Sequence, residues 1–209
     1  MISQTDLLAA LNLTLVISQQ EARPRTIFEL CELAFSGGVT TLQLREKSAY
    51  ARDFYNLALQ LVPFCRARER LFIINDRPDI ALAVKADGVH LGQNDLPALA
   101  AREILPKSMI LGVSVANLSQ ANEAIEAGAD YLGLGAIIST DSKTEAEVIE
   151  NSEIDAIIKT GALTVGIGGI NLENCQKIRS FGFTGLAVIS AIAGAQDPKM
   201  AAQILAGQK

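Results

Sequence analysis

The sequence predicts an α/β protein whose short strands alternate with helices around a closed barrel. Short β-branched runs alternate along the chain with longer segments of helical period, a pattern that is typical of βαβ units with parallel strands. No Pro- or Ser-rich linker interrupts the 209 residues, so we expect a single domain over residues 1–209. Eight such units in a chain of this length predict a compact (β/α)8 TIM barrel.

The predicted strands are short runs rich in Val, Ile and Leu, namely Leu13–Ile17, Thr40–Leu44, Leu71–Ile74, Gly88–Leu91, Met109–Val113, Tyr131–Leu134, Leu163–Ile167 and Gly185–Ile189. The predicted helices lie between them, at Arg25–Ser36, Ala49–Arg66, Pro78–Val84, Pro97–Ile104, Ser119–Ala127, Ser152–Thr160, Leu172–Phe181 and Pro198–Ala206. An open doubly wound sheet is the alternative, but the chain lacks a dinucleotide-binding glycine fingerprint.

A weak internal repeat supports the alternation. The segments "SGGVTTLQL", "KADGVHLG", "AGADYLGLG" and "FGFTGLAVIS" each contain a helix end, a glycine, a short turn and a strand. The glycine of each segment fits a left-handed residue that ends a helix.

The composition excludes several function classes. Apolar residues make up 49 % of the chain and the net charge is −5, while aromatic residues are only 5 %, so nucleic-acid binding is not expected. The cysteines Cys31, Cys65 and Cys175 are scattered, which argues against a disulfide scaffold or a structural zinc site. The N-terminus lacks a signal-peptide pattern, and no apolar run has membrane-spanning length. We therefore expect a cytoplasmic protein without a membrane partner, and a homo-oligomer stays open.

Two aspartates come after neighbouring predicted strands. Asp76 comes after Leu71–Ile74, and Asp95 comes after Gly88–Leu91. Active sites of such barrels lie at the carboxyl ends of the strands, so these carboxylates should lie close together. Two close carboxylates repel unless one is protonated or a cation bridges them, and Mg²⁺ prefers such ligands. The alternative for Asp95 is that it caps the next helix.

The second strand continues into a charged segment. The alternation of a strand places Gln43, Arg45 and Lys47 on one side and Leu44 on the other. Cations that point into a barrel mouth are costly unless they meet an anion. The alternative is a salt bridge between Arg45 and Glu46 at the rim.

Two further loops favour a ligand with phosphate groups. The polar loop Gly135–Val148 is long enough to form a lid over the site. The alternative is a disordered surface loop. The segment Gly166–Asn171, "GIGGIN", comes after the seventh strand, and Ser190 comes after the eighth. Loops at these two positions recurrently bind phosphate in barrels. The alternative is that the glycines serve tight packing.

These residues together resemble the thiamine phosphate synthase family. The resemblance extends over nearly the whole chain and rests on "QLREK" (43–47), "NDR" (75–77), "ADGVHLGQNDLP" (86–97), "LGVSV" (111–115), "IGGI" (167–170) and "VISAI" (188–192). The family joins hydroxymethylpyrimidine diphosphate to thiazole phosphate and yields thiamine monophosphate and pyrophosphate.

The resemblance implies a role for each matching residue. The diphosphate and the pyrimidine would be held by Gln43, Leu44, Arg45, Glu46, Lys47, Asn75, Ser114 and Lys143. The thiazole phosphate would be held by the lid residues Thr140, Asp141 and Ser142 together with Gly169, Ile189 and Ser190. Asp76 and Asp95 would hold Mg²⁺, and Arg45, Ser114 and Lys143 would be catalytic.

The resemblance also implies a dissociative mechanism. Pyrophosphate leaves first, and the thiazole nitrogen then attacks the pyrimidine-methyl cation. The nitrogen needs no deprotonation, so no base is required. The only histidine is His90, and a structural role is expected for it.

The sequence departs from the family pattern at two places. Ala116 stands where the family often has a histidine, and Ala136, Ile138, Ser139 and Ser142 replace two prolines, an aromatic residue and a threonine of the lid. We expect a floppier lid and an altered thiazole site. The alternatives are a related thiazole tautomerase, disfavoured by Ala116, a non-catalytic phosphate-binding paralogue, and a sugar-phosphate isomerase, which would leave "QLREK" unexplained.

Overall fold

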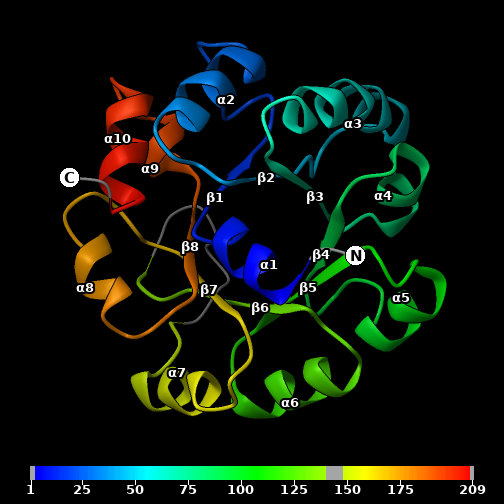
Figure 1. Cartoon of the computed structure of the whole chain (residues 1–209), viewed down its shortest axis with the longest axis vertical. Helices are drawn as coiled ribbons and strands as arrows, with labels where there is room; N and C mark the ends of the chain where they lie inside the picture. The colour runs from blue at the N-terminus through cyan, green and yellow to red at the C-terminus, as the bar shows by residue number, and fades with distance from the viewer. Residues whose placement is uncertain (1–2, 140–147, 208–209) are drawn as a thin grey trace.

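A computed structural model describes residues 3–139 and 148–207 and shows a closed parallel barrel (Figure 1). Each strand pairs with the next along the chain, and the first pairs with the last. The predicted (β/α)8 barrel is confirmed, and the open sheet is excluded by this closure. The strands in the described part of the chain are β1 (Leu13–Ile17), β2 (Thr41–Leu44), β3 (Leu71–Asn75), β4 (Gly88–Leu91), β5 (Ile110–Val115), β6 (Tyr131–Leu134), β7 (Thr164–Ile167) and β8 (Gly185–Val188).

The helices between the strands form an outer ring (Figure 1). They are α2 (Ile27–Ser36), α3 (Ala51–Arg66), α4 (Pro78–Val84), α5 (Ala98–Ile104), α6 (Leu118–Glu126), α7 (Asn151–Ile158), α8 (Cys175–Arg179) and α10 (Pro198–Leu205). Most predicted ends are correct within one to three residues. A capping box of Thr26 and Glu29 fixes the start of α2.

Helix α8 is shorter than the predicted segment Leu172–Phe181. The Asn171 side chain accepts hydrogen bonds from the backbone N–H groups of Glu173 and Asn174, at 3.0 Å each. Such an Asx turn competes with the helix, so the helix begins only at Cys175.

The repeated glycines are confirmed at three of four places. Gly38, Gly128 and Gly182 have φ values of 102°, 84° and 93°. In the second segment the left-handed residue is Lys85, with φ of 55°, so assigning that role to Gly88 was wrong. Gly88 is needed for space instead, since a Cβ there would lie 2.6 Å from the carbonyl oxygen of Ile110.

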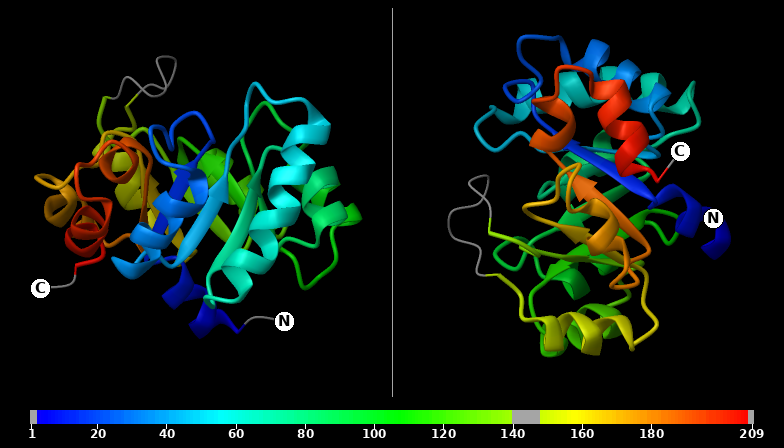
Figure 2. Two further views of the ribbon diagram at one scale, coloured as in Figure 1. Left: turned by 90° about the horizontal axis from the view of Figure 1, so that it is seen from above. Right: turned by 90° about the vertical axis from the view of Figure 1, so that its left-hand side faces the viewer.

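Two short helices were not predicted, α1 (Gln4–Ala10) and α9 (Ser190–Ala193). Figure 1 shows α1 across the centre of the ring, and the left view of Figure 2 shows it at one end of the strands. The Thr41 hydroxyl at the start of β2 donates to the carbonyl oxygen of Ala10 at 2.7 Å. Helix α1 therefore closes the end where the strands begin and leaves the opposite end open.

The apolar core has two parts. One lies between the strands and the helices. The other fills the barrel interior, where Leu7 and Leu11 pack with Val16, Ile73, Ile110, Tyr131, Val165 and Ala187. A side chain on Gly112 would overlap the ring of Tyr131, so this glycine gives the tyrosine its place in the interior. Within the described residues, no helix is long and apolar enough to cross a membrane.

Replacing Leu11 by alanine should lower the free energy of unfolding by about 2–5 kcal/mol, because the change leaves a cavity at the closed end of the barrel. Leu11 is 1 % exposed. Urea unfolding followed by circular dichroism measures this. Leu8→Ala is the matched control, because Leu8 lies in α1, which ends just before Leu11, and is 52 % exposed, so its truncation should cost less than about 0.5 kcal/mol. Equal losses in both variants would contradict the role given to α1.

Candidate active site

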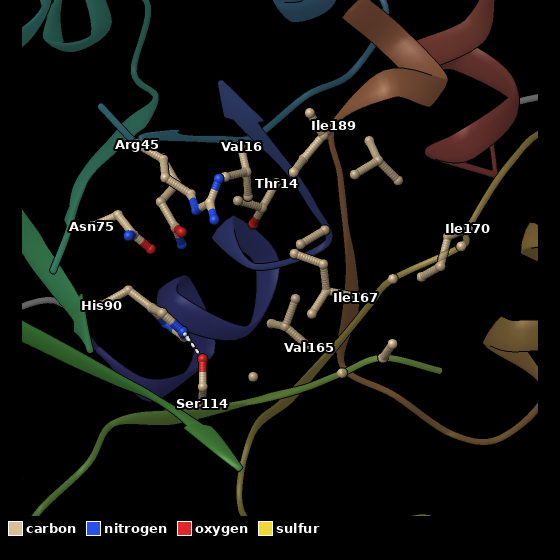
Figure 3. Close-up of a pocket in the computed structure, with 18 of the residues that line it drawn as sticks. Thr14, Val16, Arg45, Asn75, His90, Ser114, Val165, Ile167, Ile170 and Ile189 are labelled. Atoms are coloured by element: carbon tan, nitrogen blue, oxygen red, sulfur yellow. Dashed lines mark hydrogen bonds between the residues drawn. The ribbon is translucent and has the colours of Figure 1, made fainter. Parts of the chain in front are cut away.

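The open end of the barrel contains a pocket of about 380 Å³ (Figure 3). Its lining comes from strands and adjoining loops on all sides of the barrel. The predicted site residues that line it are Gln43, Arg45, Asn75, Ser114, Gly169, Ile189 and Ser190. The structure therefore brings these seven together at one place, from five different strands or the loops after them.

The two sides of the pocket differ in polarity. Strands β2 to β5 contribute Arg45, Asn75, His90 and Ser114, whose polar ends point inward in Figure 3. The facing side carries apolar side chains of β1, β7 and β8, namely Val16, Val165, Ile167, Ala187 and Ile189. A ligand with one charged end and one flat apolar surface fits such a pocket.

The segment "QLREK" divides between the two faces of β2 and its end. Gln43 and Arg45 line the pocket, whereas Leu44 is fully buried between the barrel and the helices. Leu44 thus lies on the far side of the strand from the pocket, and its side chain cannot contact a ligand there. Lys47 is exposed at the rim.

Glu46 does not pair with Arg45. Its Oε1 accepts the backbone N–H of Gln19 at 2.6 Å, which ties the loop after β2 to the loop after β1. The ion pairs in residues 3–139 and 148–207 are Arg68–Glu32, Arg77–Asp79 and Arg102–Asp130. The salt bridge between Arg45 and Glu46 that was the alternative is therefore not found. Arg45 instead lines the pocket, where its charge can meet an anionic ligand.

Asp76 and Asp95 lie in direct contact, as their positions after β3 and β4 predict. Burial raises the pKa of Asp76 to about 6, and a hydrogen bond and repulsion from Asp95 contribute to this rise. The charges of Lys47 and Arg45 oppose it. Two acids and two cations therefore share one side of the barrel mouth.

The backbone fixes both aspartates. Asp76 has φ of 64°, and its N–H donates to the carbonyl oxygen of His90 at 2.8 Å. The Oδ2 of Asp95 accepts the N–H of Gly92 at 2.7 Å and so closes its own turn. The residue that caps α5 is Pro97, without a side-chain bond, so the alternative of Asp95 as a helix cap is wrong.

The acid pair fits a divalent cation. Two adjacent carboxylates repel unless one binds a proton or a cation lies between them. The raised pKa of Asp76 reflects this repulsion together with its burial. Among the described residues no group of three or more His, Cys, Asp or Glu could hold a metal. Two carboxylates suit Mg²⁺, which keeps several waters and takes its remaining ligands from substrate phosphates.

The loop after β7 lies directly against the segment after β6. The N–H groups of Ile137 and Ile138 donate to the carbonyl oxygens of Ile167 and Gly168, at 3.0 and 3.2 Å. Gly168 and Gly169 have φ values of 101° and 67°, and a Cβ on either would lie 2.7–2.8 Å from atoms of residues 136 and 138. The tight packing offered as an alternative is present at both glycines, but Gly168 and Gly169 also line the pocket, so their part in binding phosphate stays a prediction.

Ser114 is part of a buried polar cluster with two residues that were given no ligand role. The Nε2 of His90 lies 2.9 Å from the Oγ of Ser114, and its Nδ1 lies 2.9 Å from the hydroxyl of Tyr131. All three residues line the pocket. The structural role expected for His90 agrees with these two bonds, but its place in the pocket wall goes beyond that role.

Thr140, Asp141, Ser142 and Lys143 lie outside the described residues, as does most of the segment 135–148 that was predicted to form a lid. The floppiness expected for this lid stays a prediction. Ser139, which precedes Thr140, lines the pocket. Ala116 is exposed, and its N–H donates to the Gln120 side chain.

Sequence reasoning missed the lining residues that sit inside strands, among them Thr14, Val16, Tyr131, Val165, Ile167 and Ala187. Most of the predicted site residues come from the segments just after the strands, whereas these side chains lie within strands and point inward. The alternation of side chains along each strand could have identified these residues, but only once it is known which face of the strand points into the barrel.

Comparison with known proteins agrees with this site. The sequence profile of a family described as thiamine monophosphate synthase matches residues 13–192. The chain belongs to this family. It is 45 % identical over 194 residues to the thiamine-phosphate synthase of Ruminiclostridium cellulolyticum, covering 92 % of each chain. It is 43 % identical over 196 residues to that of Methanobrevibacter smithii, covering 93 % of each.

Solved structures give the same result. Thiamine phosphate pyrophosphorylase from Pyrococcus furiosus superimposes with a TM-score of 0.86 at 39 % identity, over 95 % of both chains. A 3-hexulose-6-phosphate synthase matches with a TM-score of 0.68 at 17 % identity, over 94 % of this chain and 98 % of the other, which shows the shared fold alone. As a member of the thiamine monophosphate synthase family, the chain is an enzyme of the transferase class.

Asp76→Asn should make the metal-free protein more stable at about pH 8, by about 1 kcal/mol after allowance for the partial exposure of the carboxyl. The folded-state pKa of Asp76, about 6, lies above the ordinary value of 3.8, so ionisation destabilises the fold. This cost develops as the pH rises from about 4 to about 6, so the two proteins should converge at about pH 4. Asparagine also tolerates the left-handed backbone.

Urea unfolding at both pH values, with and without Mg²⁺, measures the effect. Mg²⁺ should stabilise the wild type and leave Asp76→Asn unchanged. Asp79→Asn is the control, because the Arg77 side chain lowers the pKa of Asp79, so this change should slightly destabilise the fold and keep the response to Mg²⁺. An Asp76→Asn protein that is still stabilised by Mg²⁺ would contradict the metal assignment.

Proposed function

We propose that this chain condenses hydroxymethylpyrimidine diphosphate with thiazole phosphate to form thiamine monophosphate and pyrophosphate. The observation that carries the proposal is the charge pattern of the barrel mouth. Asp76, which lies against Asp95, is within electrostatic reach of Arg45 and Lys47 at the rim. Arg45 lines the pocket, and the loop with Gly168 and Gly169 lines its other side. One pocket can therefore receive two phosphorylated substrates.

The polar side of the pocket would bind the pyrimidine diphosphate. Arg45 and Lys47 supply cations for the phosphate oxygens, and Asn75 and Gln43 supply neutral hydrogen bonds to the ring. Asp76 and Asp95 would hold Mg²⁺, which neutralises charge on the diphosphate when bound. Leu44 and Glu46 act only indirectly, because they hold β2 and its loop in position.

The thiazole phosphate would bind at the loops after β7 and β8. Gly169, Ile189 and Ser190 line this side of the pocket. The resemblance adds Thr140, Asp141 and Ser142 to this group and Lys143 to the diphosphate.

The reaction breaks the bond between the pyrimidine methylene carbon and a diphosphate oxygen, and the electron pair leaves with pyrophosphate. Arg45 and Lys47 are positioned for the negative charge that develops on the leaving group, a preorganised electrostatic effect. A thiazole nitrogen lone pair then forms the new C–N bond, so no proton has to be removed. The apolar side chains of Val165, Ile167 and Ile189 exclude water from the reactive carbon.

Pyrophosphate release by the purified protein tests this proposal. The assay supplies hydroxymethylpyrimidine diphosphate and Mg²⁺ with and without thiazole phosphate. We expect steady release that requires both substrates. Tight binding of the diphosphate without release would instead favour the non-catalytic paralogue, and turnover of a thiazole alone would favour the tautomerase. A cytoplasmic location and the absence of nucleic-acid partners stay predictions.

Lys143→Ala should lower kcat about tenfold or more, because a charge-assisted contact to a leaving group is worth at least ~1.4 kcal/mol. Steady-state pyrophosphate release measures the change. Lys159→Ala is the matched control, since Lys159 is exposed at the end of α7 and does not line the pocket. A Lys143→Ala rate equal to that of the control would remove Lys143 from the site.

A further inference from the structure

A chain of polar side chains, buried except for the partly buried Ser114, runs across the wall of the pocket. It joins Gln43, Tyr131, His90 and Ser114, from four different strands. Gln43 hydrogen-bonds the hydroxyl of Tyr131, and His90 bonds both Tyr131 and Ser114 at 2.9 Å. Figure 3 shows the His90–Ser114 bond at the pocket wall. Tyr131 and His90 are only 4 % and 8 % exposed.

The glycines around this chain hold the rings in place. A Cβ on Gly133 would lie 2.8 Å from Cε1 of His90, and a side chain on Gly112 would overlap the ring of Tyr131. Each ring thus fills the space that a neighbouring strand leaves. The packing of the barrel interior therefore holds both rings within hydrogen-bond distance of each other.

The two hydrogen bonds that His90 makes to Tyr131 and Ser114 can run in either of two directions, because a neutral imidazole has a single ring proton. In one, Tyr131 donates to Nδ1 and Nε2–H donates to Ser114. In the other, Ser114 donates to Nε2 and Nδ1–H donates to Tyr131, whose own proton then needs another acceptor, such as the Gln43 oxygen. The tautomer of His90 therefore couples the two bonds.

The chemistry of the two groups determines which direction is favoured. A phenol, whose ordinary pKa is about 10, is a strong donor, and a neutral imidazole nitrogen is a strong acceptor, so Tyr131 donates to Nδ1 of His90. Burial raises the pKa of the Tyr131 hydroxyl, so this residue stays a phenol with a proton to donate. The hydrogen bond of Gln43 acts against this rise and lowers the pKa of the Tyr131 hydroxyl, as a donor to that oxygen does.

We propose that the chain donates hydrogen bonds from Gln43 through Tyr131 and His90 to Ser114, and that His90 is held as the neutral Nε2–H tautomer. The Ser114 oxygen is then occupied as an acceptor, and its own O–H is left to donate into the pocket. Tyr131 and His90 are positioning residues, which act through Ser114.

This direction predicts what Ser114 recognises. A serine that must donate selects an acceptor atom on the ligand and disfavours a donor at the same place. With the proposed function, the acceptor belongs to the pyrimidine diphosphate. The identity of this ligand rests on the proposed function. The proposed tautomer of His90 does not depend on it.

The tautomer can be measured directly, because His90 is the only histidine in the chain. The wild-type protein, freed of any histidine tag and labelled with ¹⁵N-histidine, is examined by long-range ¹H–¹⁵N correlation at about pH 8, where an unperturbed imidazole is neutral. We expect Nε2 to show the shift of a protonated nitrogen and Nδ1 that of an unprotonated one. The reverse assignment, or an even mixture, would overturn the proposal.

Tyr131→Phe removes the donor to Nδ1, so His90 should become a mixture of its Nδ1–H and Nε2–H tautomers. With the pyrophosphate assay, we expect kcat to fall about tenfold in Tyr131→Phe, and the combined loss with Ser114→Ala to be much smaller than the product of the single losses. Tyr55→Phe is the matched control, because Tyr55 is partly buried on α3 outside the barrel. It should change neither the tautomer nor kcat.

The outcomes separate this inference from the proposed function. A locked Nε2–H tautomer in a protein without pyrophosphate release would keep the inference and reject the function. An unlocked or reversed tautomer in an active enzyme would reject the inference and keep the function. Fully multiplicative losses for Tyr131→Phe and Ser114→Ala would also overturn it, because the two residues would then act separately.

Discussion

The closure of eight parallel strands is the constraint on which the site depends. It brings the ends of strands that are distant in sequence to one mouth, and α1 closes the other end through Leu7 and Leu11. The alternation along each strand then divides neighbours between core and pocket, as Leu44 and Gln43 show. A ligand site thus arises wherever inward side chains near the open end are polar or small.

The charges at this mouth stabilise one another only in part. Asp76 and Asp95 repel, and the cations Arg45 and Lys47 offset this without removing it, as the raised pKa of Asp76 shows. A metal ion and a diphosphate would complete the balance of charge. The apolar side chains of β7 and β8 form the side of the pocket that faces Arg45. The His90 chain adds a fixed direction to the hydrogen bonds offered by Ser114.

Much of this could be predicted from the sequence, because strand ends, turn glycines and acidic pairs have local signals. The strand boundaries and the contact between Asp76 and Asp95 came from such signals. The role of α1 could not be predicted, because its burial depends on where the barrel closes. The partners of His90 could not either, since Tyr131 and Ser114 reach it only through the register of β4, β5 and β6.

The most direct test is a calorimetric titration of hydroxymethylpyrimidine diphosphate into the protein, with Mg²⁺ and with a chelator in its place. Because the acid pair and the diphosphate repel without a cation between them, the account predicts tight binding only when Mg²⁺ is present. Equal affinity in both conditions would contradict it, since Asp76 and Asp95 would then have no part in holding the diphosphate.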